Sequence, residues 1–469
     1  MIATIATLFY LAGILAAVEA VMTARTAQGA IAWSVSLVSF PFVALPAYLV
    51  LGRSNFAGMT AAYAQRRQEI DTLVAEVREN LRPWGIGVTE QSTYCAIHKL
   101  SGMELTKGNQ VELLVNGQAT FDSILAGIAQ AKHYALVQFY MFHDDGLGRR
   151  MQQALIERAA AGVRVYMLYD EVGSKGLPRS YVDELRAAGV EVSSFKPNQG
   201  WRNRFQLNFR NHRKMVVVDG ETGWVGGHNV GDEYLGLDPE MTPWRDTHVR
   251  IVGPAVLQLQ VAILGDWYWA TRAIPELIWQ PKAAPDGDTR VMIVPSAPTH
   301  HIETAGLLFV SALNSAKEAI WISAPYFVPD EAVMKALQLA ALRGVDVRII
   351  TTGKGDSLAV YLAAFHYMHE LRDLGIRFYA YKPGFLHEKV MLVDNEASTV
   401  GTANFDNRSF RLNFEVTALV IDRDFAARMK AMFENDFAHG KLIDPAAFDR
   451  KPFWWRLGVE LSRLAAPVL

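Results

Sequence analysis

The chain has 469 residues, of which 51% are hydrophobic and 20% are charged, a composition that excludes disorder as its main state. Its 46 Lys and Arg residues nearly balance its 48 Asp and Glu residues, which leaves a formal net charge of −2. A protein that holds nucleic acid usually carries a clear basic excess, so this balance disfavours a nucleic-acid partner. The length corresponds to about three domains of roughly 150 residues each.

Two apolar runs open the chain, Ile2 to Met22 and Ile31 to Leu51. Each is close to the about 20 residues that a helix needs to cross a bilayer. A cleavable signal peptide is the alternative for the first run, but no basic residue lies ahead of it and a second run follows after a short loop. We therefore expect residues 1–52 to form a two-helix transmembrane hairpin with spans at about 2–22 and 31–51.

The arginines near these runs predict the orientation of the anchor. The loop between the runs holds Arg25 alone, whereas Arg53, Arg66 and Arg67 follow the second run. Cytoplasmic loops of membrane proteins are enriched in Lys and Arg. The sequence therefore predicts that the N-terminus and the bulk of the chain both lie on the cytoplasmic side.

Amphipathic helices are expected on both sides of the main body of the chain. We interpret residues 53–105 as a linker that contains a connecting helix over 57–81, which would lie on the membrane surface. The apolar face of this helix is formed by Ile70, Leu73, Val74 and Val77. The C-terminal segment 452–469 is also amphipathic, and it either packs on the core or lies on the membrane.

An internal repeat organises the rest of the chain. The order of features that begins at Val111 recurs from Val291: a β-rich run, a helical stretch, a buried strand, a helix ended by glycine and a β-branched strand. This order is typical of βα units around a parallel sheet. We predict an α/β fold of two pseudo-twofold-related lobes, 106–280 and 289–469, each a mostly parallel sheet flanked by helices. The Pro-, Gly- and Asp-rich stretch at 280–288 is the expected linker.

The same motif, H-x-K-x₄-D-x₆-G-x₂-N, stands at the matching place in both copies. The first copy consists of His212, Lys214, Asp219 and Asn229, and the second of His387, Lys389, Asp394 and Asn404. One such motif is weak evidence of function. Two copies at matching positions of a repeat predict a single catalytic site that both lobes build.

These residue types suit a reaction at a phosphodiester. Two residues apart on a strand, His and Lys point to the same face and share one pocket. Histidine can attack or protonate a substrate, whereas Lys and Asn donate hydrogen bonds to the charge that develops on phosphate oxygens. The sequence has no carboxylate or cysteine cluster with metal-ligand spacing and no phosphate-binding loop. We therefore expect neither a metal nor another cofactor.

The doubled motif resembles that of the phospholipase D superfamily, in which two such motifs meet at one active site. More closely, the chain resembles bacterial cardiolipin synthases with two N-terminal spans. This finer resemblance rests on the apolar anchor and on four blocks, Tyr169 to Ser174, Gly231 to Gly236, Trp244 to His248 and Asn404 to Glu415. The chain departs from the pattern at Gly227, where the family often has Ser or Thr, as Thr402 does in the second copy.

The resemblance implies transfer of a phosphatidyl group between two phosphatidylglycerol molecules, which yields cardiolipin and glycerol through a phosphatidyl-histidine intermediate. It implies His212 as the nucleophile and His387 as the acid and base, with the reverse assignment open. The phosphate oxygens would be held by Lys214, Lys389, Asn229 and Asn404, and the histidines would be oriented by Asp246 and Glu415. The motif aspartates would lie behind the reacting face.

The resemblance also implies a place in the bacterial inner membrane, with several spans and with the catalytic lobes on the cytoplasmic side. Phosphatidylglycerol, cardiolipin and the bilayer are then the expected partners. Two alternatives stay open within the superfamily, a hydrolytic phospholipase D that releases phosphatidic acid and a phosphatidyltransferase that uses another alcohol. A nucleic-acid phosphodiesterase is disfavoured by the spans and the net charge, and an inactive scaffold by the completeness of both motifs.

Overall fold

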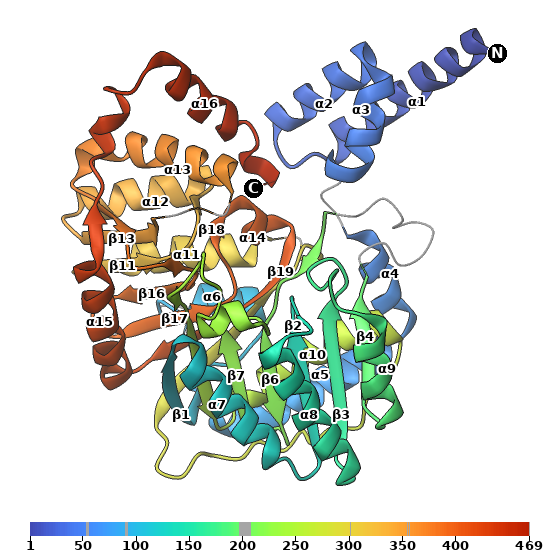
Figure 1. Cartoon of the computed structure of the whole chain (residues 1–469), viewed down its shortest axis with the longest axis vertical. Coiled ribbons are helices and arrows are strands. Elements are labelled where there is room, and N and C mark those ends of the chain that lie inside the picture. The colour runs from blue at the N-terminus through green and yellow to red at the C-terminus, as the bar shows by residue number, and fades with distance from the viewer. Residues whose placement is uncertain are drawn as a thin grey trace.

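The computed structural model describes residues 1–52, 56–89, 92–196, 208–300, 302–353, 355 and 357–468. A group of N-terminal helices stands apart from a body of two lobes, at the same end of the molecule as the C-terminal helix (Figure 1). The group consists of α1 (Ile2–Thr23), α2 (Ala27–Ser39) and α3 (Pro41–Ala47), the last continued by a π-helical turn, Tyr48–Gly52. Within the described residues one helix, Ala3–Thr23, is long and apolar enough to cross a membrane.

The second predicted span, 31–51, is not a single helix. The chain leaves the helical conformation at Phe40, where φ is −135° and ψ is 58°. The next residue, Pro41, has no N–H group with which to continue the hydrogen bonds of α2, but it suits the first turn of a new helix. The rings of Trp33 and Tyr48 lie 5.2 Å apart, so α3 folds back along α2. The predicted two-helix hairpin is therefore corrected to three helices.

The first lobe follows a connecting segment with helices α4 (Ala57–Gln65), α5 (Arg67–Leu81) and α6 (Cys95–Ser101). Its strands are β1 (Thr106–Val115), β2 (Tyr134–Phe139), β3 (Arg164–Asp170), β4 (Glu191–Phe195), β5 (Arg210–Asn211), β6 (Met215–Val218), β7 (Thr222–Gly226), β8 (Trp244–Arg245) and β9 (Thr247–Val252). Its helices are α7 (Asn116–Ala129), α8 (Gly146–Ala160), α9 (Arg179–Ala187) and α10 (Val256–Thr271).

The second lobe repeats this succession. Its strands are β10 (Thr289–Ser296), β11 (Ala319–Ser323), β12 (Phe327–Val328), β13 (Asp346–Thr352), β14 (Arg377–Tyr381), β15 (Phe385–Leu386), β16 (Val390–Val393), β17 (Ala397–Gly401), β18 (Phe405–Asp406), β19 (Asn413–Ile421) and β20 (Gly440–Leu442). Its helices are α11 (Thr304–Ser315), α12 (Glu331–Leu342), α13 (Leu358–Glu370), α14 (Asn407–Arg411), α15 (Arg423–Ala438) and α16 (Phe453–Arg463).

One sheet runs through both lobes. In the described residues it has sixteen strands, and β1 and β10 pair antiparallel at its centre. Outward from this pair the order β9, β7, β6, β2, β3, β4 on one side matches β19, β17, β16, β11, β13, β14 on the other. The predicted α/β class and the duplication are confirmed.

The prediction that each sheet is mostly parallel is wrong. Along the two halves of the sheet, only β2, β3 and β4, and their counterparts β11, β13 and β14, pair in parallel, and off this path β5 pairs in parallel with β19. The other pairings along each half are antiparallel, as between β6 and β7. The turn at 219–221 that joins these two strands is too short for the crossover that parallel strands need. The sheet is therefore mixed.

Helices cover both faces of this sheet. Residues of α10 and α15 share one buried cluster with strands of both lobes. The opposite face is covered by α7, α8 and α9 in the first lobe and by α11 and α12 in the second. The two lobes therefore share a hydrophobic core on one face of the sheet and have separate cores on the other.

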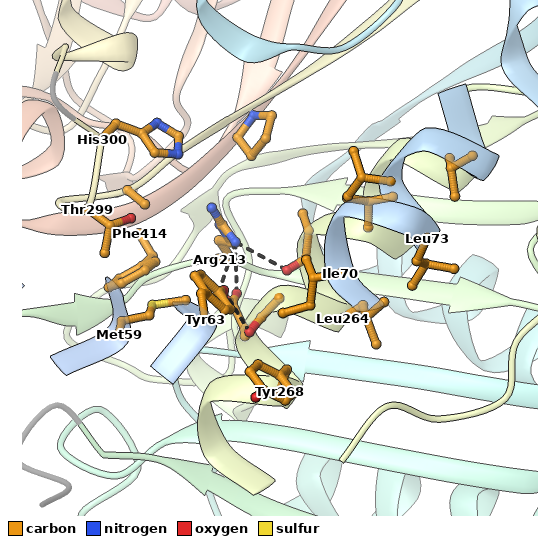
Figure 2. Close-up of a pocket in the computed structure, with 18 of the residues that line it drawn as sticks. Met59, Tyr63, Ile70, Leu73, Arg213, Leu264, Tyr268, Thr299, His300 and Phe414 are labelled. Carbon is orange, nitrogen blue, oxygen red and sulfur yellow. Dashed lines mark hydrogen bonds and ion pairs between the residues drawn. The ribbon is translucent and has the colours of Figure 1, made fainter. Parts of the chain in front are cut away.

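The predicted connecting helix is interrupted at Arg66, and its second half, α5, faces the protein. Val77 and Leu81 of α5 are buried against α10. Ile70 and Leu73 line a cavity of about 320 Å³ beside α10, which Figure 2 shows together with Arg213. The apolar stripe of α5 thus has its partner within the body, and the prediction that it lies on a membrane surface is wrong.

The C-terminal helix α16 packs on α13 and also exposes apolar side chains. The rings of Trp455 and Phe365 lie 5.1 Å apart, and Nδ1 of His366 lies 2.9 Å from Oε1 of Glu460. Trp454, in contrast, is 77% exposed. Of the two predictions for this segment, the structure therefore supports packing on the body.

Candidate active site

Each histidine motif reaches the other lobe through a short pair of strands. β5 of the first lobe pairs in parallel with β19 of the second, and β15 of the second pairs in parallel with β8 of the first. The amide of His212 donates to the carbonyl of Phe414 at 3.0 Å, and the amide of His387 donates to that of Arg245 at 2.8 Å. The spacing had predicted that each histidine and its lysine lie on a strand. In the structure they instead follow the short strands β5 and β15.

The crossed strands place each histidine beside an acid of the other lobe. Nδ1 of His212 lies 3.0 Å from both carboxylate oxygens of Glu415, and Nδ1 of His387 lies 2.8 Å from Oδ2 of Asp246. Both carboxylates are buried. Because an ionised carboxylate only accepts hydrogen bonds, each imidazole carries its proton on Nδ1 and leaves Nε2 for a substrate.

The two carboxylates are held by different groups. Glu415 also accepts hydrogen bonds from the hydroxyls of Thr402 at 2.6 Å and Ser409 at 3.0 Å. The counterpart of Thr402 is Gly227, where a Cβ atom would lie 2.0 Å from Oδ1 of Asp246. Gly227 therefore leaves the space that the carboxylate of Asp246 occupies. This explains why the chain departs from the family pattern at this position.

Both lysines fold back on their own motif. Nζ of Lys214 donates to the carbonyl of His212 at 2.7 Å, and Nζ of Lys389 donates to the carbonyl of His387. Nζ of Lys214 also lies 5.4 Å from the ring centre of Tyr140, which packs edge-on against His212 at 5.1 Å. The sequence did not reveal Tyr140, because it lies within an apolar run and belongs to no motif.

Burial sets the protonation of the histidines. It lowers the pKa of His212 to about 4 and that of His387 to about 3. The charges of Lys214 and Lys389 each add to the lowering at both histidines, so the two motifs form one electrostatic centre. Both imidazoles are therefore neutral at neutral pH, the state in which Nε2 attacks or takes a proton. An anionic phosphate in the site would raise both pKa values.

The two predicted phosphate-binding asparagines differ in their surroundings. Oδ1 of Asn229 accepts from the amide of Met141 at 3.2 Å, and its Nδ2 donates to the hydroxyl of Tyr234 at 2.6 Å. Oδ1 of Asn404 is buried and has no hydrogen-bond partner among the described residues. Both ends of the Asn229 amide thus bond to the protein, whereas the unpartnered atom of Asn404 is its carbonyl oxygen, an acceptor.

Aromatic rings surround His387. The ring centres of Trp244, Phe385 and Tyr234 lie 5.2, 6.0 and 6.2 Å from that of the imidazole. Phe385 and Trp244 come from the paired strands β15 and β8. Such a wall excludes water, which strengthens electrostatic interactions at the reacting atoms.

The motif aspartates lie where the backbone turns and not beside the histidines' reactive nitrogens. The carboxylate of Asp219 accepts from the amides of Lys132, His133 and Tyr134, each at 2.8 Å. Asp394 accepts in the same way from the amides that open β11, at 2.8 to 3.2 Å. Both aspartates have a positive φ, 54° and 52°. The sequence analysis placed Asp219 and Asp394 in the motifs that build the catalytic site. Their contacts instead support a structural role for both residues.

Replacing Asp219 by Ala is expected to lower the free energy of unfolding by about 2–3 kcal/mol, because three backbone amides lose their acceptor. The turnover of the molecules that remain folded should stay close to that of the parent. Urea unfolding combined with activity per folded molecule measures both quantities. Asp286→Ala is the control for backbone strain, since Asp286 is exposed and has a φ of 55°. Lost turnover at unchanged stability would instead make Asp219 catalytic.

Among the described residues, one group has the composition of a metal site, namely His143, Asp145 and Glu233. Its members already have protein partners. Asp145 accepts from the amides of Gly148 and Asp232, and Nδ1 of His143 lies 3.2 Å from Oε1 of Glu233. Helix capping and an ion pair therefore account for this group without a metal.

Comparison with known proteins agrees with this geometry. The family described as "Cardiolipin synthase, PLD-like domain" matches residues 124–252 and 309–437. Cardiolipin synthase A of Pseudomonas putida (strain W619) is 49% identical over 468 residues, which cover 98% of this chain and 97% of the relative. Cardiolipin synthase A of Pseudomonas fluorescens (strain SBW25) is 47% identical over 471 residues, which cover 99% and 98%.

A solved structure supports the fold. The crystal structure of phosphatidylserine synthase from Haemophilus influenzae Rd KW20 covers 80% of this chain and 100% of its own chain, with a TM-score of 0.62 and 14% identity. At that identity the similarity concerns the arrangement of the two lobes and not the substrate. The two matched repeats and the two relatives show that the chain belongs to the cardiolipin synthases with PLD-like domains.

Proposed function

We propose that the protein is a membrane-bound cardiolipin synthase that transfers a phosphatidyl group from one phosphatidylglycerol to another and releases glycerol. The observation that carries this proposal is the pair of neutral, buried imidazoles, each oriented by a carboxylate of the other lobe. Two imidazoles at one centre suit a double displacement, because one can form a covalent intermediate while the other moves protons. The relatives named above support the choice of lipid substrates.

In the first step, Nε2 of His212 attacks the phosphorus of one phosphatidylglycerol. A P–N bond forms while the bond from phosphorus to the glycerol oxygen breaks. His387, which becomes protonated because the bound anionic phosphate raises its pKa, gives its proton to that oxygen. In the second step, neutral His387 takes the proton of a hydroxyl on the second phosphatidylglycerol, whose oxygen attacks phosphorus as the P–N bond breaks. Cardiolipin leaves, and His387 is again protonated. The reversed assignment of the two histidines fits the pseudo-symmetry as well.

The other residues of the site would stabilise the charge on the phosphate oxygens and orient the two histidines. Lys214, Lys389 and Asn404 would hold the non-bridging oxygens of the phosphate, where charge develops during both steps. Asn229 would act through Tyr234, to which it donates. Asp246 and Glu415 would keep the proton of each histidine on Nδ1, so that Nε2 points to phosphorus.

We propose that the lobes lie on the cytoplasmic side of a bacterial inner membrane, since arginines follow the apolar N-terminal segment. Anchoring would hold the site at the lipid surface, where a lipid hydroxyl competes better with water. The division into lobes at 106–280 and 289–469 is part of this proposal, and the starts of β1 at Thr106 and β10 at Thr289 support it.

The proposal predicts the products formed by the purified protein in phosphatidylglycerol vesicles without nucleotide. Cardiolipin and free glycerol should appear in equal amounts, because each transfer releases one glycerol. Thin-layer chromatography and an enzymatic glycerol assay measure the two. Phosphatidic acid as the main product would make the protein a hydrolytic phospholipase D, and headgroup exchange with an added alcohol in place of cardiolipin would make it a different phosphatidyltransferase.

A further inference from the structure

The N-terminal helices meet the lobes at two points. Just after α1, Nη1 of Arg25 lies 3.2 Å from Oε1 of Glu303, which also binds Arg411 of the second lobe. Phe56, four residues beyond the end of the π-helical turn at Gly52, is 1% exposed in the core that the two lobes share. Four residues span at most about 14 Å. The chain therefore leaves the lobe surface at Arg25 and is back beside it at Gly52.

The two helices between these points are too short for a crossing each. At 1.5 Å per residue, the 22 residues of α1 extend about 33 Å, which matches the about 30 Å of a bilayer's hydrocarbon core. The 13 residues of α2 extend only about 20 Å. α3 with its π-helical turn extends a similar distance in the opposite direction, because Trp33 of α2 faces Tyr48.

The bend between α2 and α3 lies beside the middle of α1. The ring of Phe42 is 5.0 Å from that of Phe9, and a Cβ atom at Gly13 would lie 2.5 Å from the carbonyl oxygen of Leu37. Gly13 thus allows the bend to approach the α1 backbone closely. Phe9 and Gly13 lie about 21 and 15 Å along α1 from its lobe-side end at Thr23. The bend is therefore at the depth of the bilayer centre.

The bend between α2 and α3 and the outer faces of the three N-terminal helices are compatible with the hydrocarbon core of a bilayer. The carbonyl of Phe40 accepts from the amides of Val43 and Ala44, and Pro41 has no N–H group to satisfy. Broken helices are tolerated at membrane depth when backbone groups are satisfied in this way. The exposed apolar side chains of the unit include Leu8, Leu11, Leu15, Val18, Ile31, Val35, Val38, Phe40, Phe42 and Val43.

We propose that α1 alone crosses the bilayer and that α2 and α3 form a re-entrant hairpin in the leaflet on the side of the lobes. The N-terminus then lies on the opposite side of the membrane from the catalytic lobes. A two-span anchor would put Arg25 across the membrane from Glu303, which the observed ion pair excludes. The re-entrant arrangement also brings Arg25 to the same side as Arg66, in better agreement with the enrichment of arginine in the cytoplasm.

Single cysteines distinguish the two arrangements. In a Cys95→Ser background, cysteine is placed at exposed positions near the N-terminus (Ala3→Cys), after the α1–α2 loop (Gln28→Cys) and on α12 of the second lobe (Lys335→Cys). Intact spheroplasts are treated with a membrane-impermeant maleimide, before and after permeabilisation. We expect Ala3→Cys to be labelled in intact spheroplasts, and Gln28→Cys and Lys335→Cys only after permeabilisation.

Each other pattern overturns the proposal. Labelling of Gln28→Cys from the side opposite to Lys335→Cys would restore the two-span hairpin, and labelling of all three positions from one side would show that α1 does not cross. Labelling in detergent shows that every cysteine is reactive. Cardiolipin formation by the three variants shows that the protein is folded. Since labelling reports only on sidedness, the test is independent of the proposed reaction.

Discussion

Replacement of either His212 or His387 by Ala is expected to reduce the initial rate of cardiolipin formation by at least about 10³-fold. Among the residues that the structure describes, each histidine is the only imidazole that bonds to its partner carboxylate through Nδ1, so no other described residue can take its place. The rate is measured with phosphatidylglycerol vesicles. His439→Ala is the matched control, because His439 is exposed at the end of α15 and bonds to the carbonyl of Asn435.

The two variants should differ in the intermediate that they accumulate. With His212 as the nucleophile, His387→Ala still forms an acid-labile phosphatidyl adduct, and His212→Ala forms none. Rapid quenching with radiolabelled lipid detects the adduct on the protein. The opposite pattern would reverse the assignment of the two histidines, and full activity of either variant would contradict the proposed mechanism.

Removing the cation from the buried cluster of Arg245, Glu388 and Asp436 is expected to destabilise the folded protein by about 3–5 kcal/mol. Arg245 of the first lobe lies 2.9 Å from Glu388 and 2.7 Å from Asp436, both of the second lobe. Arg245→Met leaves the two carboxyl groups buried without their partner. Urea unfolding in detergent measures the loss, and the exposed pair of Arg250 and Glu112 provides the control. Arg250→Met should cost less than about 1 kcal/mol.

The destabilisation should depend on pH. Burial and the charge of Asp436 together raise the pKa of Glu388 to about 7, against the opposing charge of Arg245. A carboxyl group whose pKa is raised by folding binds more protons in the folded state, so its contribution to stability is lost as pH rises through the folded pKa. Arg245→Met removes the charge that opposes this shift, so its effect should be larger at pH 8 than at pH 5. Equal effects at both pH values, or an effect no larger than that of Arg250→Met, would contradict this interpretation.

Local sequence patterns determined much of the fold. The repeat from Val111 and Val291 predicted two similar α/β lobes, since helix, glycine and β-branched strand follow one another in both copies. The proportion of parallel strands was overestimated, because the βα order of the first half of each repeat was extended to the whole lobe, whereas the short turn after β6 reverses the chain. The second apolar run was read as one span despite Pro41 and Pro46, because membrane helices tolerate proline. The conformation at Phe40 shows that the helix ends there.

By itself, the sequence singled out the residues that we propose carry the chemistry, because His212, His387 and their lysines stand in matched motifs that need no structure to be found. It also pointed to Asp246 and Glu415. Only the tertiary structure decided that these acids are exchanged between the lobes, at separations of 141 and 203 residues from their histidines. The pairing of β5 with β19 and of β8 with β15 causes this exchange, and such long-range pairing leaves no periodic pattern in the sequence.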